Sequence, residues 1–144
     1  MGRRTQTKVG LVSARADLPT LRARLAGLDV ATVRAAVWTA RALRRTKREL
    51  AGRGLEGARV APPPPLPAHA RRGVMAVIRR KPNTCLERAL VLQRWEASHG
   101  APSEVVIGVP GRGGDFVAHA WLEHMPDGQV AAYHEIHRIP APVD

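Results

Sequence analysis

Five prolines stand close together near the middle of the chain, and they restrict its fold more than any other feature. They fall within residues 61–67, at Pro62, Pro63, Pro64, Pro65 and Pro67. Because proline lacks the backbone N–H and has a fixed φ, this stretch is expected to be a stiff, extended spacer rather than a helix or central strand. The sequence thus divides into residues 1–60, the spacer and residues 68–144. At 144 residues, the whole chain is the size of one compact domain overall.

The positive charge is concentrated before the spacer. Residues 1–60 contain 14 Lys and Arg against 4 Asp and Glu, whereas residues 61–144 contain 9 against 8. A basic region of this size can bind nucleic acid, an anionic membrane or an acidic protein. Only five aromatic residues are present and none lies in the densest basic run, residues 41–53, so the sequence does not favour nucleic acid. No window approaches the roughly 18 apolar residues of a membrane span.

Residues 17–50 have the spacing of two amphipathic helices with a break near Gly27. The first carries Leu18, Leu21 and Leu25 on one side. The second is expected to be long, with an apolar side and arginines on the opposite side. Its apolar members are Val30, Val33, Val37 and Leu43, and its arginines are Arg34, Arg41, Arg45 and Arg48.

After a short helix expected at residues 68–80, a second helix has complete start signals. Thr84 is a suitable N-cap, and Glu87 stands three residues later as its capping-box partner. Cys85 would then be the first helical residue, where free N–H groups and the helix dipole stabilise a thiolate. Cys85 remains either such a nucleophile or a small core residue. The helix is expected to be buried and to stop at Gly100, with Glu87 and Arg94 at its wetter edge.

The rest of the chain has the pattern of strands, expected at residues 104–109, 115–124 and 129–136 and separated by turns rich in glycine. Helices followed by an antiparallel meander predict an α+β fold. In the second strand, alternation places Val117, His119, Trp121 and Glu123 on one face. Both faces are largely apolar, so this strand is expected to be central and His119 enclosed, either as a core histidine or as the base that partners Cys85.

Two motifs together resemble a known family. They are Thr84-Cys85-Leu86-Glu87-Arg88-Ala89-Leu90 and, 34 residues after the cysteine, Ala118-His119-Ala120-Trp121-Leu122-Glu123. At this spacing they resemble the transglutaminase-like cysteine peptidases of lasso-peptide biosynthesis, the stand-alone leader peptidases or B proteins. The resemblance implies a papain/transglutaminase-like core in which the helix bearing the cysteine packs on an antiparallel sheet. It also implies removal of the leader from a ribosomally made precursor peptide, without a cofactor.

On this resemblance Cys85 attacks the scissile carbonyl, His119 transfers the proton, and a third carboxylate orients the imidazole. The family has an Asp roughly a dozen residues after the histidine, but this sequence has none there. Glu135 is the expected replacement, and Asp127, Asp144 or no carboxylate are the alternatives.

The resemblance also implies partners. A separate small leader-recognition protein would deliver the precursor, and an ATP-dependent macrolactam synthetase would act after cleavage. The basic region before the spacer is a candidate docking surface for the recognition protein or an acidic leader, and reversing Arg41, Arg44, Arg45 and Arg48 to Glu would weaken that docking. The lone cysteine and the missing secretory signal suit a cytoplasmic protein.

Other readings stay open. The thioester chemistry would equally serve acyl transfer to an amine, as in transglutaminases. A basic binding module with a structural Cys85 is the non-enzymatic alternative. The run His134-Glu135-Ile136-His137 does not predict a metal site, because successive strand residues point to opposite faces.

Overall fold

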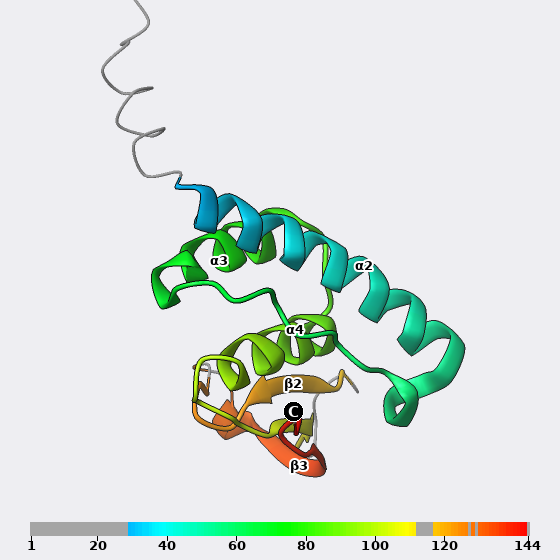
Figure 1. Cartoon of the computed structure of the whole chain (residues 1–144). Coiled ribbons are helices and arrows are strands. Elements are labelled where there is room, and N and C mark those ends of the chain that lie inside the picture. Colours follow the sequence, from blue (N-terminus) through cyan, green and yellow to red (C-terminus); the bar gives the residue numbers. More distant parts are fainter. Residues whose placement is uncertain (1–28, 112–116, 127, 129, 144) are drawn as a thin grey trace, which may run out of the picture.

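The computed structural model describes residues 29–111, 117–126, 128 and 130–143 (Figure 1). The helix expected around Leu18, Leu21 and Leu25 lies outside these residues. In chain order the elements are α2 (Val30–Gly57), the 3-10 turn η1 (Ala68–Ala70), α3 (Arg71–Arg80), α4 (Cys85–Ala97), β1 (Val105–Pro110), β2 (His119–Leu122), the 3-10 turn η2 (Val130–Ala132) and β3 (Tyr133–Ile139).

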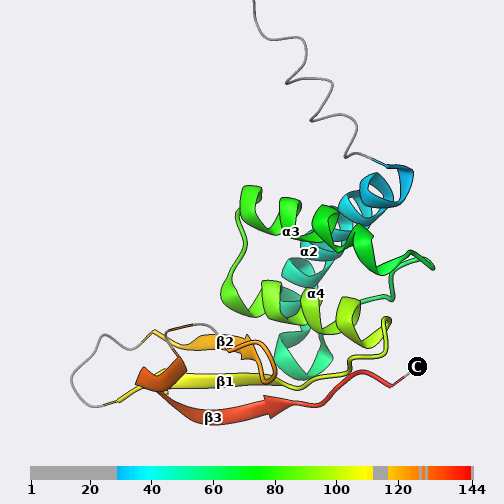
Figure 2. The ribbon, with the colours of Figure 1, turned by 90° about the vertical axis from the view of Figure 1, so that its left-hand side faces the viewer.

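The elements form three layers, which confirms the expected α+β class. Figure 2 shows α4 lying between the antiparallel sheet on one side and α2 with α3 on the other. One core cluster runs through all three layers: Ala35 of α2, Val74 of α3, Leu90 and Trp95 of α4, and Val105 of β1 belong to it. The helix that bears the cysteine is therefore the central layer. None of the helices in the described part of the chain is long and apolar enough to cross a membrane.

Helix α4 begins where its capping signals predict. The Thr84 hydroxyl accepts from Glu87 N at 3.2 Å, and Thr84 N donates to the Glu87 carboxylate at 3.1 Å. This reciprocal box makes Cys85 the first helical residue. The expected wet edge is wrong, since Glu87 and Arg94 are both buried. Glu87 is turned back into the cap, and Arg94 lies beneath the C-terminal segment where it lines a cavity.

The predicted inward side of the second helix is wrong for its three valines and right for Leu43, which is 6% exposed. Val30, Val33 and Val37 are 75%, 46% and 44% exposed, and α2 instead buries small residues. They are Thr32, Ala35, Thr39, Ala42 and Thr46, with Leu43 beside them. The reason is the close approach of α3: a Cβ added at Gly73 would lie 2.2 Å from the Thr32 carbonyl oxygen. Valines on that side would hold the two helices apart. The four arginines predicted to face outward are exposed.

The three strands are antiparallel, but they do not form a meander. Their order is β2-β1-β3, so β1 is the central strand and β2 an outer one in the described sheet. The expectation that the histidine strand is central is therefore wrong. The register of the β1–β3 pairing shifts between Ile107 and Gly108. Strand β1 pairs with β2 from Val105–Leu122 to Gly108–His119.

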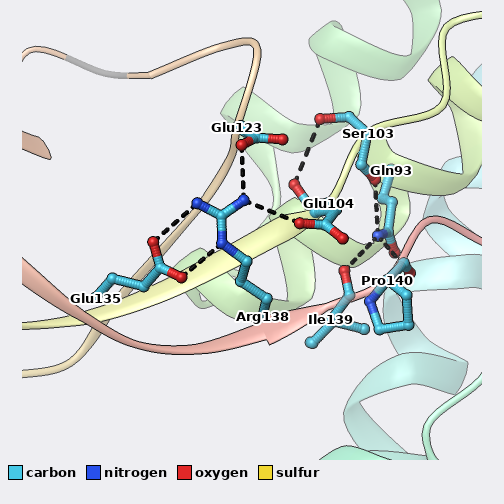
Figure 3. A network of polar contacts seen from close by, with 8 residues as sticks. All are labelled: Gln93, Ser103, Glu104, Glu123, Glu135, Arg138, Ile139 and Pro140. Carbon is cyan, nitrogen blue, oxygen red and sulfur yellow. Dashed lines mark hydrogen bonds and ion pairs between the residues drawn. The ribbon is translucent and has the colours of Figure 1, made fainter.

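Polar contacts fix the segments that cross the helices. The predicted spacer is held at both ends, where Trp38 Nε1 donates to the Ala61 oxygen at 3.3 Å and His99 Nε2 lies 3.0 Å from the Leu66 oxygen. Near the C-terminus, the buried Gln93 Nε2 lies within 3.0–3.2 Å of the carbonyl oxygens of Ser103, Ile139 and Pro140 (Figure 3). Gln93 thus connects α4 to both ends of the sheet region.

Candidate active site

Cys85 lies at the N-terminus of α4, where the sequence predicts it, and its side chain is half-buried. The first N–H groups of a helix have no partner within the helix, so they and the helix dipole favour negative charge at this position. The thiol Sγ lies 3.9 Å from the carbonyl oxygen of Ala118, the residue that precedes His119. The fold therefore brings Cys85 against the start of the histidine strand.

His119 is the first residue of β2 and is half-buried within an aromatic cluster. Its ring centroid lies 5.8 Å from that of Trp121, in a stacked arrangement, and 5.2 Å from that of Tyr133, tilted by 40°. Alternation directs Ala120 and Leu122 into the core beneath α4, and directs His119 and Trp121 toward the opposite face of the sheet. Trp121 thus stacks on the imidazole from the same face of β2, the face that alternation predicts for both residues.

Two residues of this cluster were not anticipated from the sequence. Tyr133 contacts the imidazole from β3, whereas the sequence motif leads one to expect a carboxylate from this region. Gly108 pairs with His119, and a Cβ there would lie 2.9 Å from Trp121 Cη2 and 3.0 Å from Tyr133 Cβ. A glycine at this position lets both rings close over the strand. Because these contacts join three strands, no local sequence signal marks them.

Glu135 lies in the same row of the sheet as His119, since both residues pair with Gly108. One strand stands between them, which separates their backbones by roughly 10 Å. The Glu135 carboxylate is bound by Arg138, with Oε1 2.5 Å from Nε and Oε2 2.9 Å from Nη2 (Figure 3). These hydrogen bonds lower the pKa of Glu135 below its usual value. The alternatives Asp127 and Asp144 lie outside the described residues.

Arg138 also binds two further carboxylates. Its Nη1 lies 2.6 Å from Glu123 and 2.9 Å from Glu104. The three carboxylates raise the pKa of Arg138 above its ordinary value. The cluster contains three carboxylates around one guanidinium, and these side chains are about half-exposed. Among the described residues, no group of three His, Cys, Asp or Glu side chains is arranged to hold a metal ion.

A cavity of about 560 Å³ lies on another part of the molecule. Its lining includes Leu90 and Arg94 of α4 and the C-terminal residues from His137 to Val143, but neither Cys85 nor His119. This cavity is therefore separate from the candidate residues Cys85 and His119.

Enzymes that form a thioester place a cysteine at a helix N-terminus near a histidine, and in this fold the start of α4 lies next to the start of the strand that carries His119. Residues 25–138 match the sequence profile of the transglutaminase-like superfamily, and the chain belongs to this superfamily. The superfamily includes cysteine peptidases and acyltransferases, and its members are generally cysteine-dependent enzymes. No curated protein and no solved structure matches the chain.

Proposed function

We propose that the chain is a cysteine peptidase that removes the leader from a ribosomally made lasso-peptide precursor in the cytoplasm. The observation that carries this proposal is the position of Cys85, the first residue of a capped and buried helix, 3.9 Å from the carbonyl that precedes His119. The lasso-peptide assignment rests on the two sequence motifs, and the thiol chemistry rests on the superfamily.

In the proposed reaction, His119 takes the thiol proton and the Cys85 thiolate attacks the scissile carbonyl carbon. The N–H groups of the first turn of α4 stabilise the oxyanion that forms beside the sulfur. His119 returns the proton to the leaving amine, the C–N bond breaks, and a thioester remains. Water activated by His119 then hydrolyses the thioester and restores the thiol.

Glu135 is the proposed third member of the site. Its support is its place in the same sheet row as His119, and its carboxylate would accept the imidazole N–H as an Asp does in related triads. The carboxylate accepts one hydrogen bond from Arg138 on each oxygen, and each oxygen keeps a further lone pair for another donor. The proposed partners are the precursor peptide, a separate leader-recognition protein and the macrolactam synthetase.

Alkylation of Cys85 tests the catalytic pair without a known substrate, because Cys85 is the only cysteine of the chain. We expect rapid alkylation by iodoacetamide well below about pH 8.5, the midpoint of a free cysteine. In a His119→Ala variant, the acid-side reactivity should fall toward that of a free thiol. An ordinary thiol that is indifferent to His119 would instead favour the basic binding module.

Acyl transfer is the second candidate, because the superfamily includes acyltransferases that form the same thioester. Mass spectrometry of the products, with and without an added primary amine, separates the two functions. A peptidase yields the free carboxylate under both conditions, whereas an acyltransferase yields the amide when the amine is present.

A further inference from the structure

The exposed side of α2 is strongly basic, and little of its charge is neutralised. Glu49 is one of only two acidic residues in α2, and it is already bound: its carboxylate accepts from Arg45 Nε and from Arg59 N, each at 2.8 Å. These contacts lower the pKa of Glu49 and fasten the segment after α2 alongside the helix. The exposed cations on this side of the chain are Arg34, Arg41, Arg44, Arg45, Lys47 and Arg48.

A hollow of about 130 Å³ opens in this basic surface, between α2 and the segment that follows it. Three arginines, Arg41, Arg45 and Arg59, line the hollow together with the apolar side chains of Trp38 and Val60. No hydrogen bond or ion pair joins Arg41 to any other residue in the described part of the chain. The hollow is thus the size of a side chain and combines cationic groups with apolar surface.

The hollow also contains a buried hydroxyl that lacks a partner. Thr46 lines it and is only 1% exposed, yet its Oγ1 forms no hydrogen bond with the described residues. A buried threonine in a helix usually donates to the carbonyl four residues earlier, as Thr39 does to Ala35 at 2.8 Å. An unsatisfied buried hydroxyl is unfavourable. Its position beside free positive charge indicates an acceptor supplied by a ligand.

We propose that this hollow receives a carboxylate side chain of an acidic polypeptide segment. The carboxylate pairs with Arg41 and Arg45 and accepts a hydrogen bond from Thr46 Oγ1, while a neighbouring apolar residue of the segment packs on Trp38 and Val60. A polypeptide fits better than nucleic acid, because the indole of Trp38 is already tilted against Trp95 at 5.9 Å and its N–H is bonded to Ala61. A nucleic-acid base would need an indole face that is not already in contact with another ring.

This inference deepens the proposed function, because the segment would belong to the polypeptide substrate. Trp38, which lines the hollow, packs against Trp95 of α4, the helix that begins at Cys85. The hollow would hold one part of the substrate while Cys85 cleaves another.

Binding of a synthetic peptide tests the inference. The probe is a fluorescein-labelled 12-residue peptide with a central Leu-Glu-Glu-Leu, and its control has both glutamates replaced by glutamine. The protein is the full chain carrying Cys85→Ala, which cannot cleave the probe, so a failure of the proposed peptidase activity leaves this measurement unaffected. We expect the glutamate peptide to bind at least about tenfold more tightly than the control.

Variants then locate the site. Thr46→Val removes the hydroxyl at nearly constant volume and should weaken binding about tenfold, whereas Thr46→Ser should retain it. Arg41→Gln should weaken binding more than Arg44→Gln, which removes the same charge from the same helix but outside the hollow. Thermal unfolding confirms that each variant is folded.

Any one of the following results would overturn the inference. The glutamate peptide fails to bind, Thr46→Val leaves its affinity unchanged, or Arg41→Gln and Arg44→Gln weaken it equally, as non-specific attraction requires. Displacement of the bound peptide by a single-stranded oligonucleotide or by phosphatidylglycerol vesicles at lower concentration than by unlabelled peptide would likewise reassign the hollow to those ligands.

Discussion

Arg138 binds the carboxylates of Glu104, Glu123 and Glu135 at once (Figure 3). The position of the Glu135 side chain therefore depends on this ion-pair network. The network keeps Glu135 ionised to lower pH than an ordinary glutamate, because Arg138 lowers its pKa. An ionised carboxylate only accepts hydrogen bonds, which is the form that would orient an imidazole N–H.

The proposed role of Glu135 can be measured against a neighbour in the same network. Glu135→Gln should lower kcat for precursor cleavage by at least about tenfold, because an amide orients the imidazole poorly. Glu104→Gln also removes one contact of Arg138, but it lies outside the row of His119 and should leave kcat within about twofold. Equal effects of both variants would show that only the ion-pair network matters, and Glu135 would lose its catalytic assignment.

At the start of α2, the helix cap formed by Asp29 makes the stability of the fold depend on pH. Its side chain accepts from Thr32 N at 2.7 Å and binds Arg72, and these contacts lower its pKa from 3.8 to about 2. Since the folded state holds the carboxylate in its ionised form, this contribution to stability is fully present above about pH 4 and is lost as the pH falls toward 2.

Urea unfolding of the native chain and of Asp29→Asn follows this contribution. The variant keeps a capping acceptor but no charge, so we expect it to be less stable at pH 7 and the difference to shrink between pH 4 and pH 2. A difference that is constant over that range would mean that the charge of Asp29 contributes nothing.

At the scale of elements, α2 and α3 touch through backbone rather than through large side chains. Gly73 faces the Thr32 carbonyl, and a Cβ added there would lie 2.2 Å from its oxygen. Gly73→Ala should therefore destabilise the fold by about 1–3 kcal/mol through overpacking. Gly52→Ala is the matched control, because nothing lies within 4 Å of the added atom and α2 is helical there.

The control should stabilise the chain by about 0.5–1 kcal/mol, since alanine replaces glycine in a helix. Chemical denaturation of both variants measures the two effects. Were Gly73→Ala as stable as the native chain, α2 and α3 would have to lie further apart than described.

Features that depend on residues close together in the sequence could be predicted. Features that depend on residues far apart in the sequence could not. The start of α4 follows from Thr84 and Glu87, which lie three residues apart and satisfy the helix end by themselves. The buried side of α2 depends on Gly73, which is far along the chain, so the valine spacing predicted the wrong side. The motif residues Cys85 and His119 could be selected from the sequence, but the contacts of Tyr133 and Gly108 need the strand order.

At the scale of the whole molecule, Gln93 connects α4 to the segment before β1 and to the end of β3. Its amide nitrogen lies within hydrogen-bond distance of the carbonyls of Ser103, Ile139 and Pro140. Gln93→Leu would leave these carbonyls without their donor and should cost roughly 1–3 kcal/mol. Urea unfolding gives the loss, and faster amide hydrogen exchange near β3 should accompany it.

Ser98→Ala provides the comparison for Gln93. Among the described residues, the Ser98 hydroxyl bonds only to the Arg94 carbonyl of α4, so its loss should change stability by less than about 0.5 kcal/mol. If both variants lost the same free energy of unfolding, Gln93 would not be needed to hold these segments together.

The three tryptophans of the chain fall into two environments. Trp38, which lines the basic hollow, contacts Trp95, which is 1% exposed in the core, whereas Trp121 stacks on His119. Intrinsic fluorescence therefore reports on the hollow and the core together through the first pair, and on the surroundings of His119 through Trp121. Comparing the native chain with a Trp121→Phe variant would separate the two signals without any attached dye.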